Sequence, residues 1–112
     1  MKKIHLLLFA TILMLTVISG CKKDVAYGNV TFWFGSSNMA PATVTIYGQS
    51  NDITQFYTGG TPACNSAGCA NFYLPAGTYT YTAQSSQYTW GMNGNTLTAT
   101  VPANGCATIL LQ

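Results

Sequence analysis

Apolar and polar residues alternate with a period of two along most of the chain after residue 28. In the segment 29–35, Val30, Phe32 and Phe34 alternate with Thr31 and Trp33. This period is typical of strands that bury one face, because successive side chains point to opposite sides of a sheet. The same pattern, or a run of β-branched and aromatic residues, predicts strands over 29–35, 42–48, 53–58, 69–74, 78–83, 95–101 and 106–111.

Turn-forming residues separate these segments at 48–52, 75–77, 93–94 and 102–105. Asn93-Gly94 is the strongest of these signals, because a type I′ hairpin turn needs two residues that tolerate positive φ. Short strands with a turn roughly every ten residues are typical of a sandwich. The pattern therefore predicts an all-β fold, a single antiparallel β-sandwich of about seven strands with Greek-key, Ig-like connections.

The predicted sandwich carries very little charge. Between Val25 and Gln112 the only charged side chain is Asp52, and the sole histidine of the chain is His5. A soluble domain normally has about a quarter of its residues charged. A free protein near zero net charge tends to self-associate. A lipid tether or an assembly partner would remove the requirement for free solubility.

The N-terminal segment has the features of an export signal. Lys2 and Lys3 precede an almost uninterrupted apolar stretch over 4–17. That stretch falls short of the ~20 residues that a membrane-spanning helix needs. A positive start, a short apolar region and small residues before a cleavage point are typical of a secretory signal peptide.

The segment ends with Val17-Ile18-Ser19-Gly20-Cys21. This order resembles the lipobox of a bacterial lipoprotein, and the resemblance implies cleavage between Gly20 and Cys21 and diacylglycerol on the Cys21 sulfur. The domains expected are then a signal peptide over 1–20, a lipidated cysteine with a short polar tether over 21–28, and a β-sandwich over 29–112.

Three cysteines remain if Cys21 carries lipid. Because export leads to an oxidising compartment, we expect one disulfide and one unpaired thiol. Cys64 and Cys69 flank a plausible four-residue turn that would bring their Cα atoms within the ~4.4–6.8 Å of a disulfide. A Cys64–Cys69 bridge is the favoured pairing, and a bridge from Cys106 to either of them is the alternative.

Two neighbouring segments carry a family resemblance: GCANFYLPAGTYTYTA over 68–83 and ATVTIYG over 42–48. Together they resemble the carboxypeptidase regulatory-like (transthyretin-like) β-sandwich family. The resemblance implies that Pro75 and Gly77 turn the chain between two strands, that Tyr79 packs into the core, and that the module is structural or adhesive.

The residues Cys21-Lys22-Lys23-Asp24 also look like the mature start of small lipoproteins from Bacteroidota-type bacteria. That resemblance implies a lipid-anchored protein of the bacterial outer membrane, on its periplasmic or its cell-surface side.

The residue inventory after position 21 disfavours most chemistry. General acid–base catalysis needs a group with a pKa that can be tuned near neutrality, and the strand region offers only Asp52, tyrosines and thiols. A Ser or Cys nucleophile would lack an imidazole partner. Three thiols without histidine are one ligand too few for a closed zinc site. A calcium site needs several carboxylates, and the strand region has only that of Asp52. We expect no enzyme activity, no metal, no cofactor and no nucleic-acid partner.

Outward-facing aromatic residues are the remaining functional signal. Trp33, Tyr88 and Trp90 form the candidate binding surface, and Tyr47 and Tyr73 are further aromatics that could face outward. For any one of them, a place in the core is the more common outcome. The expected function is that of a lipid-anchored, non-catalytic cell-envelope module that binds an envelope protein. The alternative is an accessory protein that binds glycan through exposed aromatics.

Overall fold

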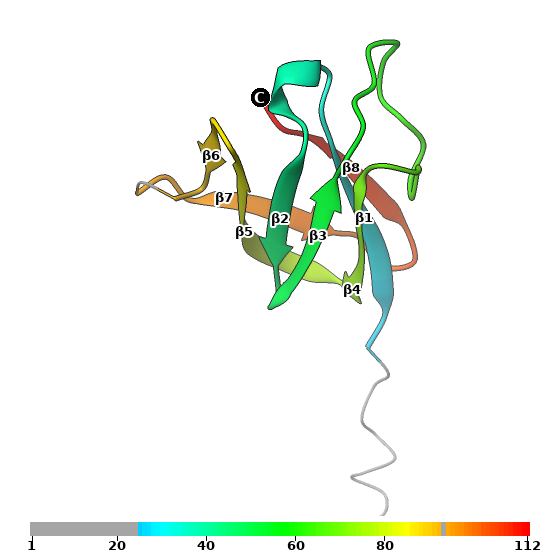
Figure 1. Ribbon diagram of the computed structural model, residues 1–112. Helices are drawn as coiled ribbons and strands as arrows, with labels where there is room; N and C mark the ends of the chain where they lie inside the picture. The colour runs from blue at the N-terminus through cyan, green and yellow to red at the C-terminus, as the bar shows by residue number, and fades with distance from the viewer. Residues whose placement is uncertain (1–24, 93) are drawn as a thin grey trace, which may run out of the picture.

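The computed structural model describes residues 25–92 and 94–112, which form two β-sheets packed face to face (Figure 1). The elements are β1 (Tyr27–Trp33), the 3-10 turn η1 (Ser37–Met39), β2 (Ala42–Ile46), β3 (Gln49–Ile53), β4 (Ala70–Pro75), β5 (Gly77–Ser85), β6 (Thr89–Trp90), β7 (Leu97–Val101) and β8 (Cys106–Leu110). The prediction of an all-β sandwich is confirmed.

One sheet has three strands in the order β4-β1-β8, and the other has the order β3-β2-β5-β6, with β7 also paired to β5. All pairs are antiparallel except β1 and β8, which run parallel. The sandwich therefore has one strand more than the approximate number expected, and it contains one parallel pair beside the expected antiparallel ones. Period-two alternation cannot distinguish them, because a strand alternates in the same way beside a parallel or an antiparallel neighbour.

The core lies between the sheets and is filled by the residues that the alternation placed inside. Val30, Phe32 and Phe34 are fully buried. The Phe32 ring lies 4.8 Å from the ring of Tyr81 on the opposite sheet and 5.8 Å, edge-on, from that of Phe72 on its own sheet. Aromatic contacts of this kind add to the free energy of burying apolar area.

The segment Pro75-Ala76-Gly77 carries the chain from the three-stranded sheet to the other sheet. The Tyr79 hydroxyl donates a 2.5 Å hydrogen bond to the Pro75 carbonyl oxygen. A tyrosine bonded in this way to the backbone a few residues upstream fixes the corner in other β-sandwiches. Tyr79 is half-buried and packs against the core cluster. It therefore lies at the edge of the core.

The first hairpin differs from the prediction. Tyr47 and Gly48 adopt positive φ of 55° and 73°, which makes a two-residue turn, and Ile46 pairs directly with Gln49. Residues 49–53, predicted largely as a turn, are strand β3. The predicted strand 53–58 is wrong, because the backbone N–H groups of Thr54 and Gln55 donate to the Gly68 carbonyl and draw the chain away from the sheet.

The Asn93-Gly94 signal does not mark a hairpin between neighbouring strands. The strands on either side of it, β6 and β7, both pair with β5, along successive parts of the same edge. Asn93 itself lies outside the described residues, and Gly94 has a positive φ of 84°.

Candidate functional site

The predicted lipidation and cleavage residues, Cys21 and Gly20, lie outside the described residues. Among the helical segments that the structure describes, none has the length and apolar character required to cross a bilayer. The lipid anchor therefore stays a prediction of the sequence.

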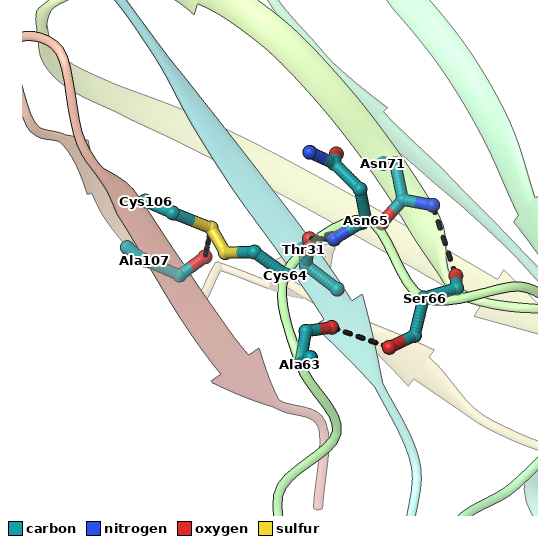
Figure 2. Close-up of a disulfide and its surroundings, with 8 residues drawn as sticks. All are labelled: Thr31, Ala63, Cys64, Asn65, Ser66, Asn71, Cys106 and Ala107. Carbon is teal, nitrogen blue, oxygen red and sulfur yellow. Dashed lines mark hydrogen bonds between the residues drawn. A yellow bond between two sulfur atoms is a disulfide. The ribbon is translucent and has the colours of Figure 1, made fainter.

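The predicted Cys64–Cys69 bridge is wrong. Cys64 pairs with Cys106, with their Cα atoms 6.3 Å apart, and Cys69 is a buried free thiol (Figure 2). The segment between Cys64 and Cys69 makes two successive tight turns, closed by Ser66 N–H to Ala63 O and Cys69 N–H to Ser66 O. These turns place Cys64 over the three-stranded sheet, where Cys106 begins β8, while Cys69 enters the buried layer just before β4.

The segment 54–69 forms a covering loop over the outer face of β1, and the disulfide fastens it there (Figures 1 and 2). Its backbone is hydrogen-bonded at two points to β1 and to the residue that follows it. Asn65 N–H donates to the Thr31 hydroxyl at 2.9 Å, and Tyr57 N–H donates to the Phe34 carbonyl at 2.9 Å. The Thr31 hydroxyl in turn donates to the Asn71 side chain. Thr31 is fully buried as a result, although the alternation placed it on the outside.

The two tryptophans of the predicted binding surface are buried. Trp33 points away from Val30, Phe32 and Phe34, as expected, but it is only 7% exposed, so the expectation that it faces solvent is wrong. Trp90 is 8% exposed, and its indole N–H donates to the Gln112 backbone oxygen. Tyr88 is 40% exposed. Neither tryptophan presents a ring face for a sugar, and Tyr88 alone of the three is accessible.

Four other tyrosines gather at one end of the sandwich and are called the tyrosine face below: Tyr27, Tyr47, Tyr73 and Tyr79. The Tyr27 and Tyr73 rings stack at 5.0 Å, and the Tyr47 and Tyr79 rings meet edge to face at 5.1 Å. Pro75 links the two pairs, because it is the strand partner of Tyr27 and its carbonyl oxygen accepts the Tyr79 hydroxyl. Desolvation raises the pKa of Tyr79, and the nearby Tyr47 and Tyr27 hydroxyls raise it further. Tyr27, Tyr47 and Tyr73 are 40%, 57% and 63% exposed.

Sequence reasoning found only part of this cluster. Tyr73 and Tyr47 could be named as outward-facing aromatics, but Tyr27 falls in the segment assigned to the tether, and Tyr79 was assigned to the core. The sequence feature that could have predicted an exposed ring is Tyr47 immediately before Gly48, because a side chain at a hairpin turn is exposed. The cluster itself arises only when the starts of β1 and β5, the end of β4 and the β2–β3 turn meet in space.

A second feature lies at the opposite end of the sandwich and is called the polar pocket below. It is an open pocket of about 380 Å³ lined by Pro41, Ala42, Thr43, Asp52, Gln84, Ser85 and Ser86. Thr43 donates a 2.7 Å hydrogen bond from its hydroxyl to the Asp52 carboxylate. The Ser85 hydroxyl accepts from the Gln87 and Tyr88 backbone N–H groups, which connects the pocket to the turn that carries Tyr88.

Asp52 therefore lies on a strand, where it bonds a side chain across the β2–β3 pair. This differs from the expected turn position with bonds to local backbone. Within residues 25–92 and 94–112, no three His, Cys, Asp or Glu side chains come together as metal ligands. The pocket instead offers hydroxyl, amide and carboxylate groups that can exchange hydrogen bonds with a polar neutral ligand. Searches against protein-family models and curated proteins find no match for this sequence.

Proposed function

We propose that this protein is a lipid-anchored, non-catalytic component of the bacterial cell envelope that acts through its surface. The observation that carries the proposal is the tyrosine face, three of whose rings are 40–63% exposed on a domain with one charged side chain after residue 24. Contiguous exposed aromatic surface on a small domain marks a site of contact with another surface. The lipoprotein-type end of the N-terminal segment supplies the anchor.

A binding role also agrees with the available chemistry. Asp52 is the only carboxylate side chain between residues 25 and 112, and Thr43 already bonds it. A general acid or base needs a second group that accepts or returns the proton during turnover. Burial raises the pKa of the Cys69 thiol and of the Tyr79 and Tyr81 hydroxyls, which moves these groups further from neutrality.

The anchor is tested by growing cells that express the full chain with labelled palmitate. The wild-type protein should incorporate label and be cleaved before Cys21. Cys21→Ser should stay unlabelled and uncleaved, because the thiol is the lipid acceptor. Lys22→Ala is the matched control and should keep both. A wild-type protein without label would refute the lipid anchor.

Binding of a protein partner at the end of the domain opposite the tyrosine face is tested in the same cells. A photoreactive amino acid replaces Ser86, an exposed residue at the rim of the polar pocket. A crosslink of defined mass from Ser86, without one from the exposed Gly59 position in the covering loop, would support a specific partner. Crosslinks at both positions or at neither would count against it.

Glycan binding is the second candidate, and the polar pocket is the observation that favours it. Sugar recognition combines hydrogen-bonding side chains with an aromatic ring, and the pocket brings Asp52, Gln84 and Ser85 close to the turn that carries Tyr88. Binding of a soluble cell-wall or surface glycan fragment should be lost in Asp52→Ala and in Gln84→Ala. Tyr47→Ser, at the other end of the domain, should leave it unchanged.

A further inference from the structure

We propose that the tyrosine face rests on the lipid headgroups of the membrane to which the protein is anchored. The inference rests on the proposed lipid anchor and adds an orientation for the domain: tyrosine face toward the bilayer, polar pocket away from it.

The first argument is the point at which the chain enters the domain. Tyr27 is both the first residue of β1 and a member of the tyrosine face. Five residues lie between it and Cys21, so the two positions can be at most about 20 Å apart even in a fully extended chain. A lipid on Cys21 therefore keeps this end of the sandwich close to the bilayer surface.

The second argument is the chemistry of this end. Its segments are Val25–Tyr27, the β2–β3 turn, the β4–β5 corner and the β7–β8 turn. They meet through Ala76 N–H to Ala26 O and Asn104 N–H to Tyr27 O, and Gly28 packs against Pro102. No charged side chain lies among residues 25–27, 47–48, 75–79 and 102–105. Val25 and Tyr73 are 62% and 63% exposed.

Tyrosine suits the boundary between headgroups and acyl chains, because its ring is apolar and its hydroxyl can stay hydrated. A protein partner would be expected to meet charged or hydrogen-bonding groups at the rim of such a patch, whereas a lipid surface needs only amphipathic rings. The two lysines that follow Cys21 would lie next to the headgroups, where anionic lipid attracts them.

The opposite end has the opposite character. It carries Asp52, the only charged side chain of the sandwich, together with the polar pocket and the β5–β6 turn. In Figure 1 the start of β1 and the β2–β3 turn lie at the lower end, and β6 and the C-terminus lie at the upper end. The polar end is therefore the one left free for a ligand.

The test uses the lipidated protein in vesicles of phosphatidylethanolamine and phosphatidylglycerol. Trypsin can release the domain from its lipid, because Lys22 and Lys23 are its only cleavage sites after residue 21. Hydroxyl-radical oxidation of each tyrosine is then measured by peptide mass spectrometry for the anchored and the released forms. Tyr27, Tyr47 and Tyr73 should be oxidised several-fold more slowly when anchored. Tyr88, which is as exposed as Tyr27, is the internal control and should not change.

A variant series gives an independent readout. Replacing Tyr27, Tyr47 and Tyr73 by serine should leave the protein on floated vesicles but speed its release by trypsin, because the tether is no longer sheltered. Tyr88→Ser should be released at the wild-type rate.

The outcomes separate the two proposals. A protein that does not float with vesicles overturns the anchor and the orientation together. A protein that floats, with its tyrosine face oxidised equally in both forms, overturns the orientation alone. Protection that occurs in cells but not in vesicles also overturns it, and assigns the tyrosine face to a protein partner.

Discussion

At the scale of single residues, burial of Trp33 is expected to contribute strongly to stability. It is 7% exposed yet packs outside the cluster that fills the space between the sheets. A Cβ built on Gly35 would lie 3.9 Å from the Trp33 ring and 3.7 Å from the Tyr57 carbonyl oxygen, so the ring lies near the covering loop. Because the ring is buried, truncation would leave a cavity. We expect Trp33→Ala to lower the free energy of unfolding by about 3–5 kcal/mol, measured by denaturant titration. Tyr73→Ala, 63% exposed, is the control and should change it by about 0.5 kcal/mol or less. Equal effects would show that Trp33 is not packed as described.

The alternation assigned Trp33 to the correct face of β1 but could not predict its burial. Period two tells which side of a sheet a residue lies on, and says nothing about what covers that side. Thr31 shows the same limit: the loop 54–69, which has no periodic pattern of its own, covers it through the Asn65 N–H bond to its hydroxyl.

Substitution of Gly28 tests the close contact between β1 and the β7–β8 turn. A Cβ built on Gly28 would lie 1.8 Å from the Pro102 carbonyl oxygen, so a side chain there must push the β7–β8 turn away from β1. Gly28→Ala should cost about 1–3 kcal/mol or more, measured as a lower denaturant midpoint with an unchanged slope. Gly59→Ala, where a Cβ would meet no atom within 4 Å, should be nearly neutral. A neutral Gly28→Ala would contradict this close contact.

At the scale of elements, the covering loop is the part whose stability depends on a covalent link. The Cys64–Cys106 bridge joins residues 42 apart in sequence, and closing a loop of that length stabilises the fold by about 4 kcal/mol in the chain-entropy description. Cys64→Ser with Cys106→Ser should lose about that amount in denaturant unfolding. Cys69→Ser, which breaks no bridge, should lose much less. A comparable loss in Cys69→Ser would show that Cys69 belongs to the bridge, and would contradict the Cys64–Cys106 pairing.

Local sequence was sufficient to predict the boundaries of some strands but not of others. Segments with clean alternation, such as 42–46 and 97–101, form strands close to the predicted bounds. The segment 49–53 has four polar residues before Ile53 and reads as a turn, yet it is strand β3 because Tyr47-Gly48 completes the hairpin first. An exposed edge strand needs no apolar face, so its sequence lacks the alternation from which strands are predicted.

At the scale of the whole molecule, the features that the sequence did not predict arise from contacts between segments far apart in the chain. The parallel β1–β8 pair and the Cys64–Cys106 bridge both join segments far apart in the chain. The tyrosine face likewise draws on β1, the β2–β3 turn, β4 and β5. Composition predicted a protein that works through its surface. That one end of the surface carries tyrosines and the other a polar pocket follows only from the assembly of the two sheets.

The last prediction concerns the response of the whole fold to alkaline pH. Burial raises the pKa of the Cys69 thiol above its ordinary value of 9.0, although a hydrogen bond with Tyr57 partly offsets this. Burial also raises the pKa of Tyr81 above 10.0. A group with a pKa that is higher in the folded than in the unfolded state contributes stability that is fully present below the unfolded value and is lost as the pH rises through the folded one.

The free energy of unfolding should therefore hold steady from pH 7 to about pH 9 and then fall, first through Cys69 and then through Tyr81. Urea titrations at pH 7, 9 and 10.5 measure it. Cys69→Ser should reduce the earlier part of the fall, and Tyr81→Phe, which keeps the ring in the core, should reduce the later part. Tyr79, whose pKa is also raised by desolvation, accounts for the rest of the later part. Tyr88→Phe is the control, because that ring is 40% exposed. If stability stayed flat to pH 10.5 in the wild type, neither Cys69 nor Tyr81 could be buried as the structure has them.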